Sequence, residues 1–149
     1  MKLTFIIIVS FICSTYSVAQ EIKEAQVPAA VVTTFKSKYP GDYVYEWEFK
    51  KKEKRYEAEF MNNGVKLEAS FDPHGTWLWT SHEIENGSLP QPVTAGLNQS
   101  EYSAWKIDDV EQRETPSGLT YQVEVENGKK EAVLYFGEDG SLKQVVNKK

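Results

Sequence analysis

The sequence predicts an α+β protein made of two tandem units, each a helix followed by a four-stranded antiparallel meander. One reason is that the chain repeats itself, since Tyr56 and Gly75 have counterparts 65 residues later in Tyr121 and Gly140. Self-similarity at a fixed spacing indicates a repeated structural unit. Each copy also alternates apolar and polar residues over short runs, which is typical of half-buried antiparallel strands. We therefore expect a roughly eight-stranded sheet with both helices on one face and a broad polar face opposite.

The first 19 residues have the features of an export signal. Lys2 is followed by an apolar run over residues 3–13 that is too short to span a bilayer. The sequence SVA then provides small residues of the kind that signal peptidases recognise. We expect cleavage near Ala19, which gives a mature chain that begins at Gln20 and resides in the periplasm or outside the cell.

Composition excludes several classes of function. Cys13 is the only cysteine and leaves with the signal, so the mature chain is expected to have no disulfide, thiol nucleophile or thiolate ligand. The formal charge of the whole chain is −5. This charge argues against nucleic acid and against anionic membrane surfaces, both of which attract basic proteins. No stretch after residue 19 is apolar enough to span a bilayer.

The first unit is expected over residues 27–84, after a short N-terminal segment at 20–26. Its helix is predicted by Val31, Phe35 and Tyr39, which recur every four residues on one stripe. Proline and glycine directly after Tyr39 end the helix. Four alternating strands follow, with tight turns between them. They are expected at residues 43–50, 55–60 and 65–72, and around Trp77 and Trp79.

The second unit is expected over residues 89–147, after a short polar linker at 85–88. Leu89, Val93 and Leu97 continue the helical stripe, although Pro92 and Gly96 make this helix intrinsically weaker. Its strands are expected near residues 105–114, 119–126, 130–136 and 141–146.

Two motifs carry a family resemblance. The first copy reads YEAEF at 56–60 and FDPHG at 71–75, and the second reads YQVEV at 121–125 and FGEDG at 136–140. Together with a helix that opens on V/L-P, these motifs resemble the PepSY-like family of secreted Bacteroidetes proteins. Gly137 departs from the pattern, because the first copy has an aspartate there. The family is similar in architecture to the beta-lactamase inhibitor protein, which binds its enzyme through the concave face of its sheet. The resemblance therefore implies a non-catalytic, inhibitor-like module with a protein partner.

The polar face of the sheet is the expected partner surface. Strand alternation gathers many carboxylates there, together with the apolar residues Leu78 and Tyr135. Such a surface favours a basic partner, with charge acting on association and the apolar residues supplying binding energy. The ordinary alternative is that these charges pair across neighbouring strands and serve stability and solubility alone. The residues assigned to partner binding are Glu46, Glu48, Glu57, Glu59, Glu68, Leu78, Glu124, Glu126 and Tyr135.

Catalytic and metal sites are not expected. Carboxylate pairs such as Glu57 and Glu59 lie at i and i+2 on a strand, so both point to the wet face rather than into an apolar pocket. His74 is expected at the tip of a hairpin, and His82 has too few neighbouring ligands for a metal site. We thus predict a non-enzyme that requires no metal and no cofactor.

The tryptophans leave a second function open. Trp47 and Trp77 share the parity of the core residues and are expected beneath the helix. Trp79 has the same parity, but its repeat counterpart is the polar Gln144, so it is assigned to the rim of a cleft. A ligand-binding or structural envelope protein that uses this cleft between the units, with Tyr135 also at its rim, is the alternative function.

Overall fold

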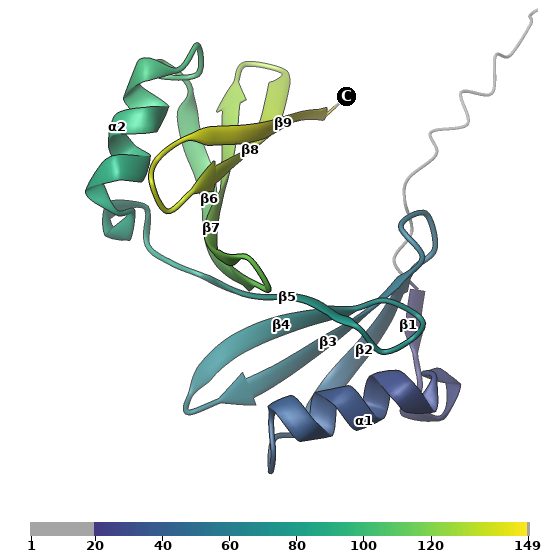
Figure 1. Ribbon diagram of the computed structural model, residues 1–149. Helices are drawn as coiled ribbons and strands as arrows, with labels where there is room; N and C mark the ends of the chain where they lie inside the picture. The colour runs from purple at the N-terminus through teal and green to yellow at the C-terminus, as the bar shows by residue number, and fades with distance from the viewer. Residues whose placement is uncertain (1–19, 149) are drawn as a thin grey trace, which may run out of the picture.

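The described part of the chain, residues 20–148, forms two α-helices and a single nine-stranded antiparallel sheet in the computed structural model (Figure 1). The expected export signal lies outside the described residues. Every strand pairs with the next one along the chain, so the α+β class is confirmed. No helix within the described range is long and apolar enough to cross a membrane. The elements are β1 (Gln20–Ile22), η1 (Glu24–Gln26), α1 (Ala29–Lys38), β2 (Val44–Lys50), β3 (Arg55–Asn62), β4 (Val65–Phe71), β5 (Trp77–Glu83), η2 (Asn86–Ser88), α2 (Gln91–Gln99), β6 (Lys106–Thr115), β7 (Gly118–Asn127), β8 (Lys130–Gly137) and β9 (Leu142–Lys148).

The sheet has one strand more than the sequence predicts. Residues of the N-terminal segment form β1, which pairs with β2 through Gln20↔Phe49 and Ile22↔Trp47. Ile22 also packs against the core beneath α1. A three-residue strand is too short for its alternation to be recognised in sequence, which explains why the segment was not expected to be a strand.

The first core lies between α1 and strands β2 to β5. Val31 and Phe35 from the helix are 0 % and 2 % exposed. The Phe35 ring lies edge-on to Phe60, with 4.9 Å between the ring centroids. Trp47 is buried in the same cluster, and Trp77 packs against it. The predicted core positions of both tryptophans are therefore confirmed.

The second core lies between α2 and strands β6 to β8. Val93 and Leu97 from the helix pack with Val123 and Phe136 from the sheet. Gly96 lets the helix approach the turn between β8 and β9 closely, because a Cβ atom at this position would lie 2.0 Å from the carbonyl oxygen of Gly140. The glycine that weakens the helix intrinsically is thus required by its packing.

A β-bulge in β5 reverses the parity read from the sequence. Phe71 pairs with Trp77 but Ser70 pairs with Trp79, so Leu78 is the extra residue. One inserted residue moves every later side chain of the strand to the other face. Trp79 therefore lies on the face opposite Trp77 and away from the first core. The parity that grouped Trp79 with Trp77 is wrong for this reason.

The segment FDPHGTW forms the hairpin between β4 and β5. One carboxylate oxygen of Asp72 accepts hydrogen bonds from the backbone amides of His74 and Thr76, both at 2.8 Å. His74 is exposed at the tip of this turn. Asp72 thus stabilises the turn by accepting hydrogen bonds from nearby backbone amides. The predicted position of His74 at the tip of a hairpin is confirmed.

Candidate functional site

Side chains from most of the strands line a shallow depression on the sheet. Along β3 and β7 these side chains alternate with the core residues, so they lie on the opposite side of the sheet from the core clusters. We call this side the open face. The depression has a volume of about 620 Å³. Its walls are charged, with one tryptophan and one tyrosine among them. The lining residues are Lys50, Glu53, Arg55, Glu57, Glu68, Trp79, Glu111, Arg113, Gln122, Tyr135, Gln144 and Val146.

Two arginines lie over Trp79 at the centre of the open face. The guanidinium carbon of Arg113 lies 4.0 Å from the centroid of the Trp79 ring, and that of Arg55 lies 5.4 Å away. Arg113 also donates a hydrogen bond of 2.9 Å to Gln122 and one of 3.1 Å to Glu111. Cation–π contacts of this kind are stronger when desolvated, and Trp79 is 9 % exposed. This group is therefore held in a fixed arrangement at the middle of the sheet.

Glu57 ties the neighbouring cations together. Its side chain is 2 % exposed, and its carboxylate oxygens lie 2.8 Å from Arg55 and 2.9 Å from Lys50. Lys50 also pairs with Glu48. Burial lowers the pKa of Lys50, but its hydrogen bonds to Glu48 and Glu57 outweigh this effect and raise the pKa above its ordinary value. Glu57 is too buried to contact a partner and instead positions Lys50 and Arg55.

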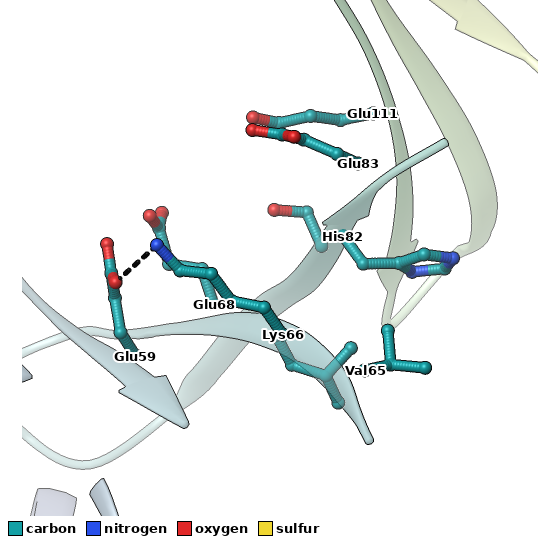
Figure 2. A pocket seen from close by; sticks show the side chains of 9 residues that line it. Glu59, Val65, Lys66, Glu68, His82, Glu83 and Glu111 are labelled. Atoms are coloured by element: carbon teal, nitrogen blue, oxygen red, sulfur yellow. Dashed lines mark ion pairs between the residues drawn. The ribbon is translucent and has the colours of Figure 1, made fainter. Parts of the chain in front are cut away.

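A second cavity, of about 370 Å³, lies where β4 and β5 diverge. Four glutamates line it, and Figure 2 shows their carboxylates pointing into a common space. Among residues 20–148, Lys66 is the one lysine or arginine that lines the cavity with them, and it lies 2.6 Å from Glu59. We call this the acidic cavity. Its lining residues are Glu59, Val65, Lys66, Leu67, Glu68, Ser81, His82, Glu83 and Glu111.

Electrostatic repulsion is strong in and around the acidic cavity. Burial raises the pKa of Glu68 to about 7, and the nearby charges of Glu57 and Glu111 raise it further. Burial also raises the pKa of Asp109, with added repulsion from Glu83 and Glu111. Glu57 and Glu68 therefore lie on the polar face without being freely solvated, since Glu57 is 2 % exposed and Glu68 is partly buried.

Glu68 should make stability depend on pH. Its folded pKa of about 7 lies above the ordinary 4.5, so the folded state holds a proton more tightly than the unfolded state. The stabilisation from this group is complete below pH 4.5 and is lost as the pH rises to about 7. At pH 8 we expect Glu68→Gln to be more stable than the wild type by about 2 kcal/mol, with no difference near pH 4. Urea unfolding at both pH values measures this, and a difference that does not change with pH would contradict it.

Histidine and metal chemistry receive no support from the geometry. The imidazole of His82 points away from the carboxylates of the acidic cavity (Figure 2). Across residues 20–148, no three His, Cys, Asp or Glu side chains are arranged so that they could hold a metal ion.

Only some of the residues that the sequence assigns to partner binding line the two hollows. Glu57, Glu59 and Glu68 line the two hollows of the open face. Glu48 and Glu46 line neither hollow and pair with Glu57 and Glu59 across β2 and β3. Tyr135 lines the depression, as does Trp79, which was assigned to a cleft rim.

The other assigned residues lie outside these hollows. Glu124 pairs with Lys148, and Glu126 pairs with Lys106 at 2.6 Å. Leu78 is the bulged residue of β5 and lines neither hollow.

Three central residues were missed by the sequence-based assignment, namely Glu83, Glu111 and Arg113. A bulge lies between Ile107 and Asp109 of β6, so the apolar residues of that strand do not alternate regularly. Glu83 follows the bulge of β5, which reverses its parity as it does for Trp79. The side of the sheet on which Glu111 and Arg113 lie follows only from their pairing with Gln122 and Thr120 on β7. The sequence does not reveal this pairing.

These features define a small α+β protein with an open, charged sheet face. A sequence model of the family described as "Putative beta-lactamase-inhibitor-like, PepSY-like" matches residues 14–67 and 54–144. The chain belongs to this PepSY-like family, as its motifs suggested.

Solved structures agree with this assignment. A BLIP-like protein from Bacteroides fragilis is similar with a TM-score of 0.66 and 32 % identity, over 80 % of this chain and 86 % of that one. A DUF2874 family protein from Bacteroides uniformis has a TM-score of 0.69 and 25 % identity, over 80 % and 88 %. A protein from Bacteroides eggerthii described as one of the "putative periplasmic proteins" shares the fold, with a TM-score of 0.67 and 20 % identity over 81 % of this chain and 88 % of that one. A search of curated proteins gave no significant match.

Proposed function

We propose that this protein is a non-catalytic, exported binding module that captures a protein partner on its open face. Membership of a family described as beta-lactamase-inhibitor-like supports a protein partner. The observation that carries the proposal is the depression of about 620 Å³, in which Trp79, Arg113 and Tyr135 are held by mutual contacts. Preorganised aromatic and arginine side chains are the groups that dominate binding energy at protein interfaces.

The proposal includes a duplicated architecture. Turn glycines at equivalent positions approach the helices in the same way: a Cβ atom on Gly75 would lie 2.7 Å from the Ala30 oxygen, and one on Gly140 would lie 2.1 Å from the Pro92 oxygen. The matching contacts support two helix–β4 units, at residues 27–84 and 89–147, joined by 85–88. Both helices then pack on one side of the sheet and leave the other side to a partner.

Export rests on the sequence of residues 1–19, with an apolar run and a small-residue cleavage site near Ala19. A partner would then be met in the periplasm or outside the cell.

Absence of catalysis is supported by the ion pairs of the buried carboxylate, because Glu57 is held by Arg55 and Lys50. Glu68 has the raised pKa that a general acid needs, but three other carboxylates line its cavity, and the apolar part of the lining is limited to Val65 and Leu67.

Partner capture tests the proposal. The double variant Glu46→Lys/Tyr135→Ala changes the open face outside the acidic cavity, and we expect at least tenfold weaker capture of a partner from the native envelope, about 1.4 kcal/mol. Quantitative mass spectrometry of the captured proteins, with the exported chain as bait, is the measurement.

The matched control is Lys36→Glu on α1, whose side chain is 66 % exposed and forms a surface ion pair with Glu24. It should leave capture unchanged. If the two variants capture the same proteins in the same amounts as the wild type, the open face is not the partner surface.

The central depression also supports the alternative of a small ligand in the cleft between the units. Its volume falls within the range of ligand pockets, and Trp79 and Tyr135 line it. A ligand there would raise the melting temperature of the wild type and not that of a Tyr135→Ala variant.

A further inference from the structure

We propose that the acidic cavity between β4 and β5 receives a lysine or arginine side chain of the partner protein. The inference rests on the proposed function, because it names the chemistry of the group that the partner inserts. It goes beyond that function by assigning a second binding feature, separate from the tryptophan at the centre of the open face.

The cavity exists because the sheet splits at this point. Pairing between β4 and β5 runs only as far as Glu68↔Ser81. Beyond it, residues 65–67 of β4 pair with β3 alone, and His82 and Glu83 of β5 pair with β6 alone. Two strand edges thus border the cavity without pairing to each other, which leaves backbone polar groups available to an incoming chain.

Two of the four glutamates in the cavity have no counter-charge among residues 20–148. Glu59 has Lys66 at 2.6 Å, and Glu111 has Arg113 at 3.1 Å. Glu68 and Glu83 have no ion-pair partner among residues 20–148. Glu68 is partly buried and is repelled by the neighbouring carboxylates. A cation that entered the cavity would relieve this repulsion, because opposite charges within a few ångströms stabilise each other most where water is scarce.

A hydroxyl group provides an observation independent of the charge. Ser81 lines the cavity and is 3 % exposed. Within the described residues its hydroxyl has no hydrogen-bond partner, and it is not among the fully enclosed polar atoms, so it stays accessible from the cavity. A guanidinium or ammonium group in the cavity could donate to this oxygen and to a carboxylate at the same time.

The size and lining of the cavity fit a side chain from a folded partner. A volume of about 370 Å³ is large enough for a long side chain, and Glu83, which lines the cavity, is exposed. The apolar Val65 and Leu67 also line the cavity and can contact the methylene groups of such a side chain. Charge complementarity therefore selects a basic side chain.

A pair of peptides that differ only in charge tests this assignment. The probes are acetyl-Gly-Gly-Arg-Gly-Gly-amide and the same peptide with the neutral isostere citrulline, each titrated against the ¹⁵N-labelled protein by NMR. We expect saturable shifts at the amides of Glu68, Ser81 and Glu83 with the arginine peptide. We also expect an affinity at least fivefold higher than for the citrulline peptide. A lysine peptide is expected to behave like the arginine peptide.

Two double variants separate the cavity from the general charge of the protein. Glu68→Gln/Glu83→Gln should weaken binding of the arginine peptide at least fivefold, whereas Glu101→Gln/Glu138→Gln removes the same charge from exposed positions and should not. Equal binding of the arginine and citrulline peptides, equal losses in the two double variants, or shifts centred on Trp79 would each overturn the assignment.

Failure of this inference is distinguishable from failure of the proposed function. If the arginine peptide does not bind but Glu46→Lys/Tyr135→Ala still weakens partner capture at least tenfold, the partner uses the open face without inserting a cation. If the peptide binds and no partner depends on the open face, the cation site holds and the proposed function is wrong.

Discussion

Replacing Glu57 by alanine is expected to lower the free energy of unfolding by about 3 kcal/mol, since the change leaves the partly buried Arg55 without its counter-charge and Lys50 with Glu48 alone. Glu57 is 2 % exposed, with Arg55 at 2.8 Å and Lys50 at 2.9 Å. Both cations lie beside the depression, so their rearrangement would also disturb the contact between Arg55 and Trp79. Urea unfolding measures the first effect, and the fluorescence of the tryptophans in the folded state reports the second.

Glu126→Ala is the matched control for Glu57→Ala. Glu126 lies 2.6 Å from Lys106, a distance similar to those around Glu57, but its side chain is 36 % exposed and that of Lys106 is 70 % exposed. Solvent screens such a pair, and its removal should cost less than about 1 kcal/mol. If both substitutions have the same small effect, Glu57 is not the structural centre of the charged network.

The fold class could be predicted because local periodicity reflects the architecture. Strict alternation around Trp47 placed that residue in the core, and the four-residue repeat of Val31 and Phe35 placed α1 over it. These patterns are long enough to survive local irregularities. A strand of three residues such as β1 leaves no such pattern, so this additional strand could not be predicted.

The candidate site was harder to predict because parity fails at bulges. The extra residue in β5 moved Trp79 to the open face, where Arg113 lies 4.0 Å from its ring. The irregularity in β6 hid Arg113 itself. Each of these errors comes from a single inserted residue that the side-chain alternation cannot reveal.

Burial on the open face is a second property that periodicity does not carry. Glu57 and Glu59 have the same parity, yet Glu57 is 2 % exposed and the side chain of Glu59 is 21 % exposed. Glu57 contacts the partly buried side chains of Lys50 and Arg55, whereas the Lys66 side chain that pairs with Glu59 is 62 % exposed. Sequence alone identifies both as polar-face residues and cannot say which one a partner can reach.

The last large effect is expected at Gly140, in the turn between β8 and β9. Gly140→Ala should lower the free energy of unfolding by about 3 kcal/mol or more, for two reasons. The residue has a φ of +78°, which disfavours any side chain, and a Cβ atom there would lie 2.1 Å from the carbonyl oxygen of Pro92. Because that oxygen belongs to the backbone of α2, the helix itself must move away from the sheet.

Two further substitutions separate backbone strain from this close contact. Gly128 also has a positive φ, of +64°, but open space around its Cα, so Gly128→Ala should cost only about 1 kcal/mol. Gly96 lies in α2, where alanine would ordinarily stabilise by about 1 kcal/mol. Its Cβ atom would meet the Gly140 oxygen at 2.0 Å, so Gly96→Ala should destabilise instead. Urea unfolding of the three variants decides the matter, and a stabilised Gly96→Ala would show that α2 and the turn are not in close contact.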